Sequence, residues 1–443
     1  MELPLSTPPA ARPPHELEYL LRLLHWTGVM RHPLAEPWAA RAYYLRSAVA
    51  NAAVAAFLCS QALALWRGGT ADIGRFTLLL STFNTVAAWL FRLGHIAVHE
   101  RQFHYLAAQV ERDFGDFLCP RDVHMMETRD RELRRVVLSY IWFGTAGCLW
   151  WIIFPLLRFG FCAAGLPFIL ELPYDVSSPL TFIPTWVFCS FITIHAAVLT
   201  IVVDSFNVSL IAQLRVQLIL LSRNIVDLAN EERDLTSSIK HMPPETSLSS
   251  DAMSGIQIRL QLRKMILHHQ AIIRNTELME KCLGAMLLGQ SLSIGAAVCF
   301  QLFQVALSAE SLAEAGKFGC YLSVMLAQLF VYCWFGDEFI TESEKVALAA
   351  YSAVTSLQGI PLSQKRSLLL MMVRAQRPLR ITAGGFFPLS RESFVSTLVN
   401  ELQTLQLLVS RQRCRKSQMS QQAADVNIPS EGGRVPSAPQ RHA

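Results

Sequence analysis

The chain has 443 residues, of which 52% are hydrophobic and 16% charged, and its formal net charge is +5. Soluble domains carry about 25% charged residues, so this composition excludes an ordinary soluble enzyme. The apolar residues gather in blocks, and this distribution predicts an all-α, polytopic membrane protein. The ten cysteines are scattered singly without a CxxC pair, which argues against a disulfide framework or a cysteine metal site.

The amino-terminal segment, residues 1–42, is rich in proline and has no continuous apolar core. A cleavable signal peptide needs such a core, so none is predicted, and the first membrane helix is expected to serve as the targeting signal. Further along, apolar stretches recur, most of them close to the ~20 residues that cross a bilayer. These seven predicted transmembrane helices are 43–66, 76–98, 136–157, 180–203, 283–307, 318–336 and 394–409.

Lysine and arginine are distributed unevenly between the loops. One set of segments holds 26 of them and the alternate loops hold four. The first set comprises 1–42, 99–135, 215–281 and 337–380, and the second comprises 67–75, 158–179 and 308–317. The positive-inside rule therefore predicts a cytoplasmic amino terminus and, after an odd number of spans, an extracellular carboxy terminus. The tail, 411–443, begins with a basic run that opposes this rule, and its Ser/Gln/Pro-rich composition predicts disorder.

The cytoplasmic loops have helical patterns of their own. Apolar residues through 204–230 predict that the fourth membrane helix continues into the cytosol, and 256–281 predicts a second helix. Between them we expect a solvated turn at 231–234 and a break over 237–254. The segment 343–377 is predicted to be helical on both sides of a break near Pro361.

Ionisable residues within apolar stretches are the next candidates. Arg92 lies near the cytosolic end of the second span, where its side chain can snorkel to the interface. His195 lies midway along the fourth span and is either a hydrogen-bonded core histidine or a ligand contact. Glu401, in the last span, either pairs with a neighbouring subunit or raises the local cation density. The adjacent His268 and His269 do not share a helix face and are interpreted as a solvated surface.

The last apolar stretch carries a polar stripe at helical spacing. Its members are Ser396, Asn400, Gln403, Thr404, Leu407 and Ser410. Polar groups are costly against lipid, so this face is expected to meet protein or water. Two interpretations follow: a hydrogen-bonded packing face, or a pore lining in which Leu407 is an apolar constriction that gates by dewetting.

Motifs for catalysis and transport are missing from the sequence. There is no GxSxG, Walker, GxGxxG or HExxH motif, so we expect no enzymatic activity, catalytic residue, metal or cofactor, and no nucleic-acid partner. A transporter is disfavoured because no inverted repeat with Gly/Pro-broken helices appears. A metabotropic seven-helix receptor would need its amino terminus outside.

Short motifs follow one another in a characteristic order through 332–408. They are Tyr332-Cys333, Phe335 to Glu338, Ser343-Glu344, Ala350-Tyr351, Arg374 to Pro378, Thr382 to Gly384, and Phe386 to Ser390 with Phe394. In this order and spacing the set resembles the carboxy-terminal region of the insect odorant receptors. The sequence departs from the family at Thr355, where a tryptophan is usual, and at Gln403 to Leu405, where a Ser-Tyr-Phe-like triplet is usual.

The resemblance implies an odorant-tuning subunit that assembles with a shared co-receptor into a heterotetramer around one pore. Such a channel would be ligand-gated and non-selective for cations, and would lie in the plasma membrane of olfactory sensory neurons, in contact with lipid. The implied layout is a ligand-binding bundle at 43–336, cytoplasmic anchor helices at 337–385 and a pore-lining helix at 386–410. A gustatory-type receptor of the same topology is the alternative, although Gln403-Thr404 stands where its Thr-Tyr signature is expected.

The resemblance also implies a small, mostly apolar pocket for a volatile odorant between the outer halves of spans two to six. The candidates are Phe83, Trp150, Trp151, Phe154, Trp186, Phe188, His195 and Tyr321. Aromatic residues at such positions are also typical of lipid-interface belts and helix packing.

Overall fold

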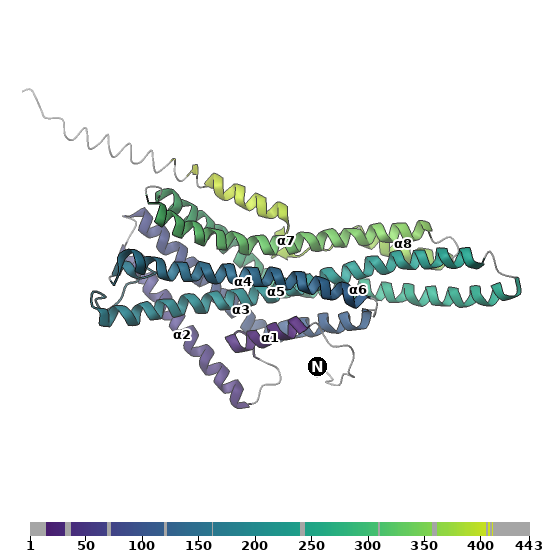
Figure 1. Cartoon of the computed structure of the whole chain (residues 1–443), viewed down its shortest axis with the longest axis horizontal. Coiled ribbons are helices and arrows are strands. Elements are labelled where there is room, and N and C mark those ends of the chain that lie inside the picture. The colour runs from purple at the N-terminus through teal and green to yellow at the C-terminus, as the bar shows by residue number, and fades with distance from the viewer. Residues whose placement is uncertain are drawn as a thin grey trace, which may run out of the picture.

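The computed structural model describes residues 15–31, 37–68, 72–118, 122–161, 163–239, 244–308, 311–356, 361–404, 406–407 and 410. The chain is almost entirely helical, which confirms the predicted all-α class (Figure 1). The elements are α1 His15–Thr27, α2 Pro37–Gly68, α3 Ile73–Phe117, α4 Val123–Phe159, η2 Ala163–Gly165, α5 Pro179–Ile239, α6 Pro244–Leu307, α7 Leu312–Ser356, α8 Leu362–Ala375, β1 Thr382–Ala383 and β2 Phe387–Pro388. A terminal helix follows at 391–404 and continues at 406–407 and 410.

Within the described residues, six helices, α2 to α7, are long and apolar enough to cross a membrane. Each contains one of the first six predicted stretches. The described part of the seventh stretch lies in the terminal helix, which is placed outside the bundle beside α7 (Figure 1). There Phe394 packs on Phe330 of α7, with ring centroids 5.6 Å apart. The predicted disordered tail, 411–443, lies outside the described residues.

Helices α5 and α6 extend far beyond the membrane-spanning bundle (Figure 1). They have 61 and 64 residues, so each is about 90 Å long, roughly three times the thickness of a hydrocarbon core. The continuation of the fourth span into a long helix is confirmed. Two expectations are wrong: residues 231–234 are helical and form no turn, and α6 begins at Pro244, inside the predicted break. Residues 240–243 lie outside the described part.

A tight hairpin connects α8 to the terminal helix. Strand β1 pairs antiparallel with β2, and the turn between them uses Gly384 and Gly385 at φ 60° and 80°, which glycine adopts at no steric cost. The hairpin is in close contact with α7. The contact is possible because position 336 is a glycine: a Cβ there would collide with the carbonyl oxygen of Leu389. Phe386, Phe387 and Leu389 therefore belong to this hairpin region and do not lengthen the terminal helix.

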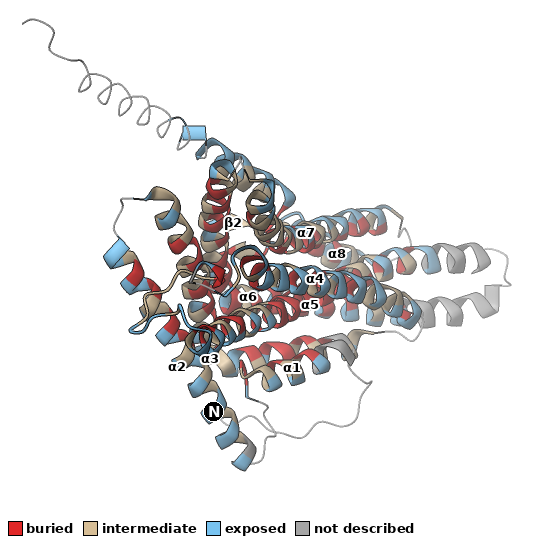
Figure 2. Cartoon of the chain, turned by 60° about the vertical axis from the view of Figure 1, so that its left-hand side comes forward, coloured by how far each residue is buried: buried red, intermediate tan, exposed pale blue. Residues whose placement is uncertain are grey.

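The parts of the helices that lie beyond the membrane-spanning bundle, here called the helical extensions, have a closely packed core. Figure 2 shows buried positions along the sides of the helices that face one another. His268 and His269 are both buried, and the ring of His268 stacks on Phe117 at 4.5 Å. Their assignment to a solvated surface is wrong, because α6 is packed by α3, α5 and α7 on several sides. Helix α1, which the sequence analysis did not predict, buries Leu20 and Leu24 against this core.

Candidate ligand-binding site

An inner cavity of about 160 Å³ lies between α3, α4, α5, α6 and α7. Most of its walls are apolar side chains and the methyl groups of threonines. It is lined by Thr82, Thr85, Val86, Ala88, Trp89, Arg92, Tyr140, Gly144, Gly147, Cys148, Trp151, Phe168, Ile192, Thr193, Ala196, Ala197, Thr200, Ile201, Gln290, Ser293, Ile294, Ala297, Tyr321, Val324, Met325 and Gln328.

Small residues explain why the helices enclose this space without collapsing into it. Gly144 and Gly147 lie three positions apart on one face of α4. A Cβ on Gly147 would come 2.7 Å from Val324 of α7, and one on Gly144 would come 3.1 Å from Ile201 of α5. The helices therefore touch at these glycines, while the short side chains around them leave room for a ligand.

The outer part of the inner cavity carries neutral hydrogen-bonding groups. The Tyr321 hydroxyl lies 2.7 Å from Thr85 Oγ1, and the Tyr321 ring lies 5.1 Å from the ring of Trp151. These contacts join α3, α4 and α7 around an aromatic wall. A hydroxyl in such a wall can offer a ligand one hydrogen bond in otherwise apolar surroundings.

The floor of the inner cavity is formed by Arg92, which belongs to a buried ion pair. The Arg92 guanidinium of α3 donates to the carboxylate of Asp204 on α5, and both side chains are almost completely buried. The same carboxylate accepts four further hydrogen bonds. They come from Tyr140 Oη at 2.9 Å, Gln290 Nε2 at 3.3 Å, Gln328 Nε2 at 2.6 Å and Tyr332 Oη at 2.9 Å.

This floor connects every helix that surrounds the cavity. Asp204 receives donors from α3, α4, α6 and α7, and Asn207 extends the network by donating to Tyr332 Oη at 3.0 Å. Charge-assisted hydrogen bonds in surroundings of low polarity are strong, and a carboxylate with its acceptor positions filled holds its partners in one arrangement. A shift of one helix would therefore displace Asp204 and, through its hydrogen bonds, the other helices.

The position of Arg92 corrects one prediction and exposes an omission. Arg92 does not snorkel to the interface; it points into the bundle and pairs with Asp204. Sequence reasoning misses Asp204 because it directly follows the apolar stretch 180–203 and resembles the first cytoplasmic residue. The available signal is charge balance: an arginine within one span requires a carboxylate in another.

The comparisons with known proteins agree with this architecture. The family model described as 7tm Odorant receptor matches residues 72–400.

The chain belongs to this family.

Odorant receptor Or2 of Anopheles gambiae is 24% identical over 327 residues, which cover 73% of this chain and 80% of that protein. Odorant receptor 13a of Drosophila melanogaster is 25% identical over 339 residues, covering 72% and 76%. Among solved structures, the insect olfactory receptor OR5 from Machilis hrabei in complex with eugenol has a TM-score of 0.73 at 16% identity. That match covers 89% of this chain and 98% of the other and shows the shared fold.

The structure of this odorant receptor brings only part of the predicted pocket together. Trp151 and Tyr321 line the inner cavity, and Phe154 lines a neighbouring outer cavity. Trp150 is 42% exposed. His195 is half-buried between the rings of Trp89 and Phe191, whose centroids lie 5.8 and 5.5 Å away. Of the predicted residues, those that line neither cavity are Phe83, Trp150, Trp186, Phe188 and His195.

The terminal helix of the receptor keeps its polar stripe away from its own bundle. The exposed residues of the stripe are Ser396, Asn400, Gln403, Thr404, Leu407 and Ser410. Leu407 is 66% exposed. Glu401 instead faces α6 of its own chain, since a Cβ on Gly295 would come 3.2 Å from its carboxylate oxygen.

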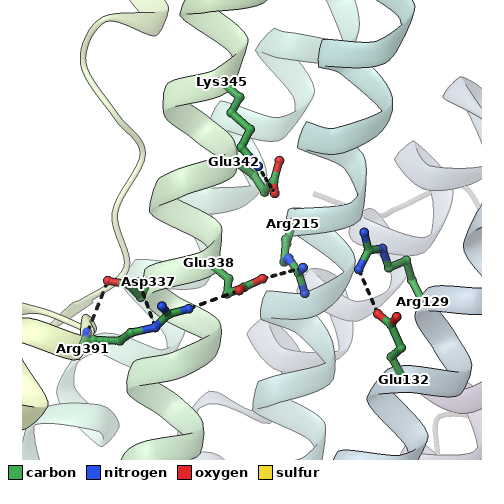
Figure 3. A network of polar contacts seen from close by, with 8 residues as sticks. All are labelled: Arg129, Glu132, Arg215, Asp337, Glu338, Glu342, Lys345 and Arg391. Atoms are coloured by element: carbon green, nitrogen blue, oxygen red, sulfur yellow. Dashed lines mark hydrogen bonds and ion pairs between the residues drawn. The ribbon is translucent and has the colours of Figure 1, made fainter.

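A polar network fixes the start of the terminal helix (Figure 3). The Arg391 guanidinium lies 3.2 Å from both Asp337 and Glu338 of α7 and 4.0 Å above the Trp334 ring. Glu338 also pairs with Arg215 of α5 at 2.5 Å. The terminal helix is therefore attached to α7, which carries Tyr332, and Glu338 ties this point of α7 to α5, which carries Asp204.

Proposed function

We propose that this receptor binds a small volatile odorant in the inner cavity and, together with co-receptor subunits, forms a ligand-gated, non-selective cation channel. The family membership supports a receptor for odorants, and the shared fold extends over nearly the whole chain. The site of action is the plasma membrane of olfactory sensory neurons, with the amino terminus in the cytoplasm.

The inner cavity is the observation that carries the proposal. It is enclosed by five helices, mostly apolar, and small enough that a molecule of odorant size would fill it. A volatile molecule offers mainly apolar surface and one or two polar atoms, so shape and a single hydrogen bond would select it. Tyr321, Thr85 and Trp151 are proposed as its contacts.

Gating requires that the ligand favour one arrangement of the helices over another. Gln290, Gln328 and Tyr140 line the cavity and also bind Asp204. Tyr332, another partner of Asp204, lies one helical turn before Gly336, on which the hairpin rests. We infer that a ligand shifts the equilibrium through Asp204, α7 and the hairpin to the terminal helix.

The pore is assigned to the terminal helix. Its exposed stripe needs a polar or aqueous partner, and copies of it from neighbouring subunits around an axis would line a wet path. In the closed state Leu407 would form the apolar constriction, and opening would move it off the axis. A ligand that favours the open state by about 3 kcal/mol would shift the equilibrium roughly 150-fold.

The test is current recording from cells that express the full chain with an insect odorant co-receptor, using a panel of volatile compounds. Ala196→Phe fills the inner cavity from α5 and is expected to abolish the responses. Ala146→Phe is the matched control, because Ala146 is exposed on α4 and is not among the residues that line the inner cavity. The proposal fails if no compound evokes current in the wild type, or if both variants respond normally while reaching the cell surface.

Leu407→Ala tests the constriction in the same cells. Removal of the apolar side chain is expected to raise the basal current, because the closed path then stays wet. Val395→Ala, an apolar truncation on the same helix outside the stripe, is the control. An unchanged basal current in Leu407→Ala would exclude the constriction.

A further inference from the structure

An outer cavity of about 220 Å³ lies next to the inner one, at the end of the bundle opposite the helical extensions. It is formed by the start of α3, the end of α4, the loop that contains η2, and the start of α7. Thr82 and Phe168 line both cavities. Only a thin layer of side chains therefore separates the two spaces.

The separating layer is aromatic. Phe168 lies edge-on to Phe57, with centroids 5.0 Å apart, and 6.3 Å from Trp151. Trp151 lines the inner cavity, and its ring carries the Lys317 ammonium at 4.2 Å. Lys317 itself lines the outer cavity, so this pair spans the boundary between the two spaces.

The Lys317 ammonium is held by aromatic rings. Besides Trp151, it lies 5.7 Å from the Phe318 ring and 6.0 Å from the Phe154 ring. Among the residues that the structure describes, none accepts a hydrogen bond from it, and Glu314, which also lines the outer cavity, forms no ion pair with it. Cation–π contacts stabilise the charge but do not use the three N–H donors of an ammonium group. The outer cavity thus combines apolar walls with the Lys317 ammonium, whose N–H donors can bind a ligand's acceptor atom.

We propose that the outer cavity is a second odorant subsite, which takes neutral molecules whose carbonyl oxygen accepts a hydrogen bond from Lys317. This inference rests on the proposed function for its role in signalling. Esters, ketones and aldehydes fit the description: an apolar body packs on Leu78 and Phe159 while the oxygen meets the ammonium. From there the ligand reaches the inner cavity past Thr82 and Phe168. A hydrocarbon of equal size has no such acceptor.

The subsite is tested by protection of an introduced cysteine, which needs no channel activity. Ala164 is exposed and lines the outer cavity. In surface-expressed Ala164→Cys receptor, 2-octanone is expected to slow modification by an extracellular methanethiosulfonate about tenfold, and octane less than twofold. Tenfold corresponds to one charge-assisted hydrogen bond of about 1.4 kcal/mol. Wild type provides the background from native cysteines.

Two further variants make the test specific. Lys317→Met added to Ala164→Cys should remove the advantage of 2-octanone, whereas Lys317→Arg should keep it. Gly316→Cys is the matched control. Gly316 is exposed on α7, next to Lys317, and a Cβ added there would meet open space. Neither compound should protect the cysteine at this position. Equal protection by 2-octanone and octane, or protection of Gly316→Cys, would overturn the proposal.

The passage between the cavities is tested separately with the strongest agonist of the panel. Modified Ala164→Cys should show a current onset at least fivefold slower, and Phe168→Ala a faster onset, at unchanged surface expression. Ala196→Phe added to Ala164→Cys should leave the protection intact, since it fills only the inner cavity. Protection without any agonist response would reject the proposed function and leave the subsite standing. Normal responses without protection would reject the subsite alone.

Discussion

Two buried carboxylates, one in each half of the molecule, are held in different ways. Asp204 lies under the inner cavity, and the side chain of its partner, Arg92, is only 6% exposed. Asp113 lies among the helical extensions and pairs at 2.8 Å with Arg274, whose side chain is 58% exposed. Asn275 and Gln109 also donate to Asp113, at 2.7 and 3.1 Å. Both carboxylates join α3 to neighbouring helices, but only Asp204 has a desolvated counter-ion.

The difference in exposure between the two arginine partners bears on what each ion pair contributes to stability. Desolvating two ions costs several kcal/mol each, and apolar residues of the same volume often hold helices together equally well. The Asp113 pair leaves its guanidinium partly in water and contributes an ordinary tie between α3 and α6. The Arg92–Asp204 pair is costly, so it adds little to stability for its expense. Under the proposed function its role is to link the ligand to the helices.

The largest expected effect comes from removing one charge at each place. Asp204→Asn keeps the shape but leaves the Arg92 charge buried without a counter-ion, so it should lower the free energy of unfolding by about 3–5 kcal/mol. Asp113→Asn is the matched control and should cost about 1–2 kcal/mol, because Arg274 can turn to water. Thermal unfolding of the purified receptor measures both. Equal losses would contradict the comparison.

The first six spans were predictable from hydropathy, but the orientation of these helices within the bundle was not. A membrane helix is apolar on the side that meets lipid and on the side that meets protein, so the sequence cannot say which aromatics turn inward. Trp150 and Trp151 show this: they are adjacent, yet only Trp151 reaches the inner cavity. The small residues that create the space, such as Gly147 and Ala196, carry no chemical signal of their own.

The burial of charged and polar residues is hard to predict from sequence where tertiary packing overrides the helix-face pattern. Adjacent histidines on an isolated helix cannot both be buried against one partner, but α6 has several partners and buries His268 and His269 together. Asp204 resembles a solvent-exposed residue at the end of the fourth span because it follows an apolar run, although it is only 2% exposed. Both errors have one cause. The helices extend well past the apolar stretches and pack against one another there, so polar residues in these parts are buried as well.

A second substitution should sharpen the comparison by restoring charge balance. Arg92→Met in the Asp204→Asn background removes the stranded charge, and the single oxygen of the side-chain amide at position 204 can still accept from two of the four tyrosine and glutamine donors around it. We expect the double variant to recover about 2–3 kcal/mol and to reach the cell surface. Its response to the strongest agonist should nevertheless fall, because the linkage between the helices is weaker. A fully responsive double variant would show that the ion pair is only structural.

The smallest effect concerns pH and involves two histidines of the helical extensions. Burial lowers the pKa of His268 to about 3 and that of His269 to about 4, so both are neutral when folded. In the unfolded chain they titrate near 6.5, so the unfolded state gains protons first and stability falls as the pH drops below that value. Between pH 7.5 and 5.5 each histidine should cost about 1.4 kcal/mol of unfolding free energy. His268→Phe keeps the stack on Phe117 and should remove about half of this loss, as measured by thermal unfolding at the two pH values. If His268→Phe loses as much unfolding free energy between pH 7.5 and 5.5 as the wild type does, His268 is not a source of the acid sensitivity.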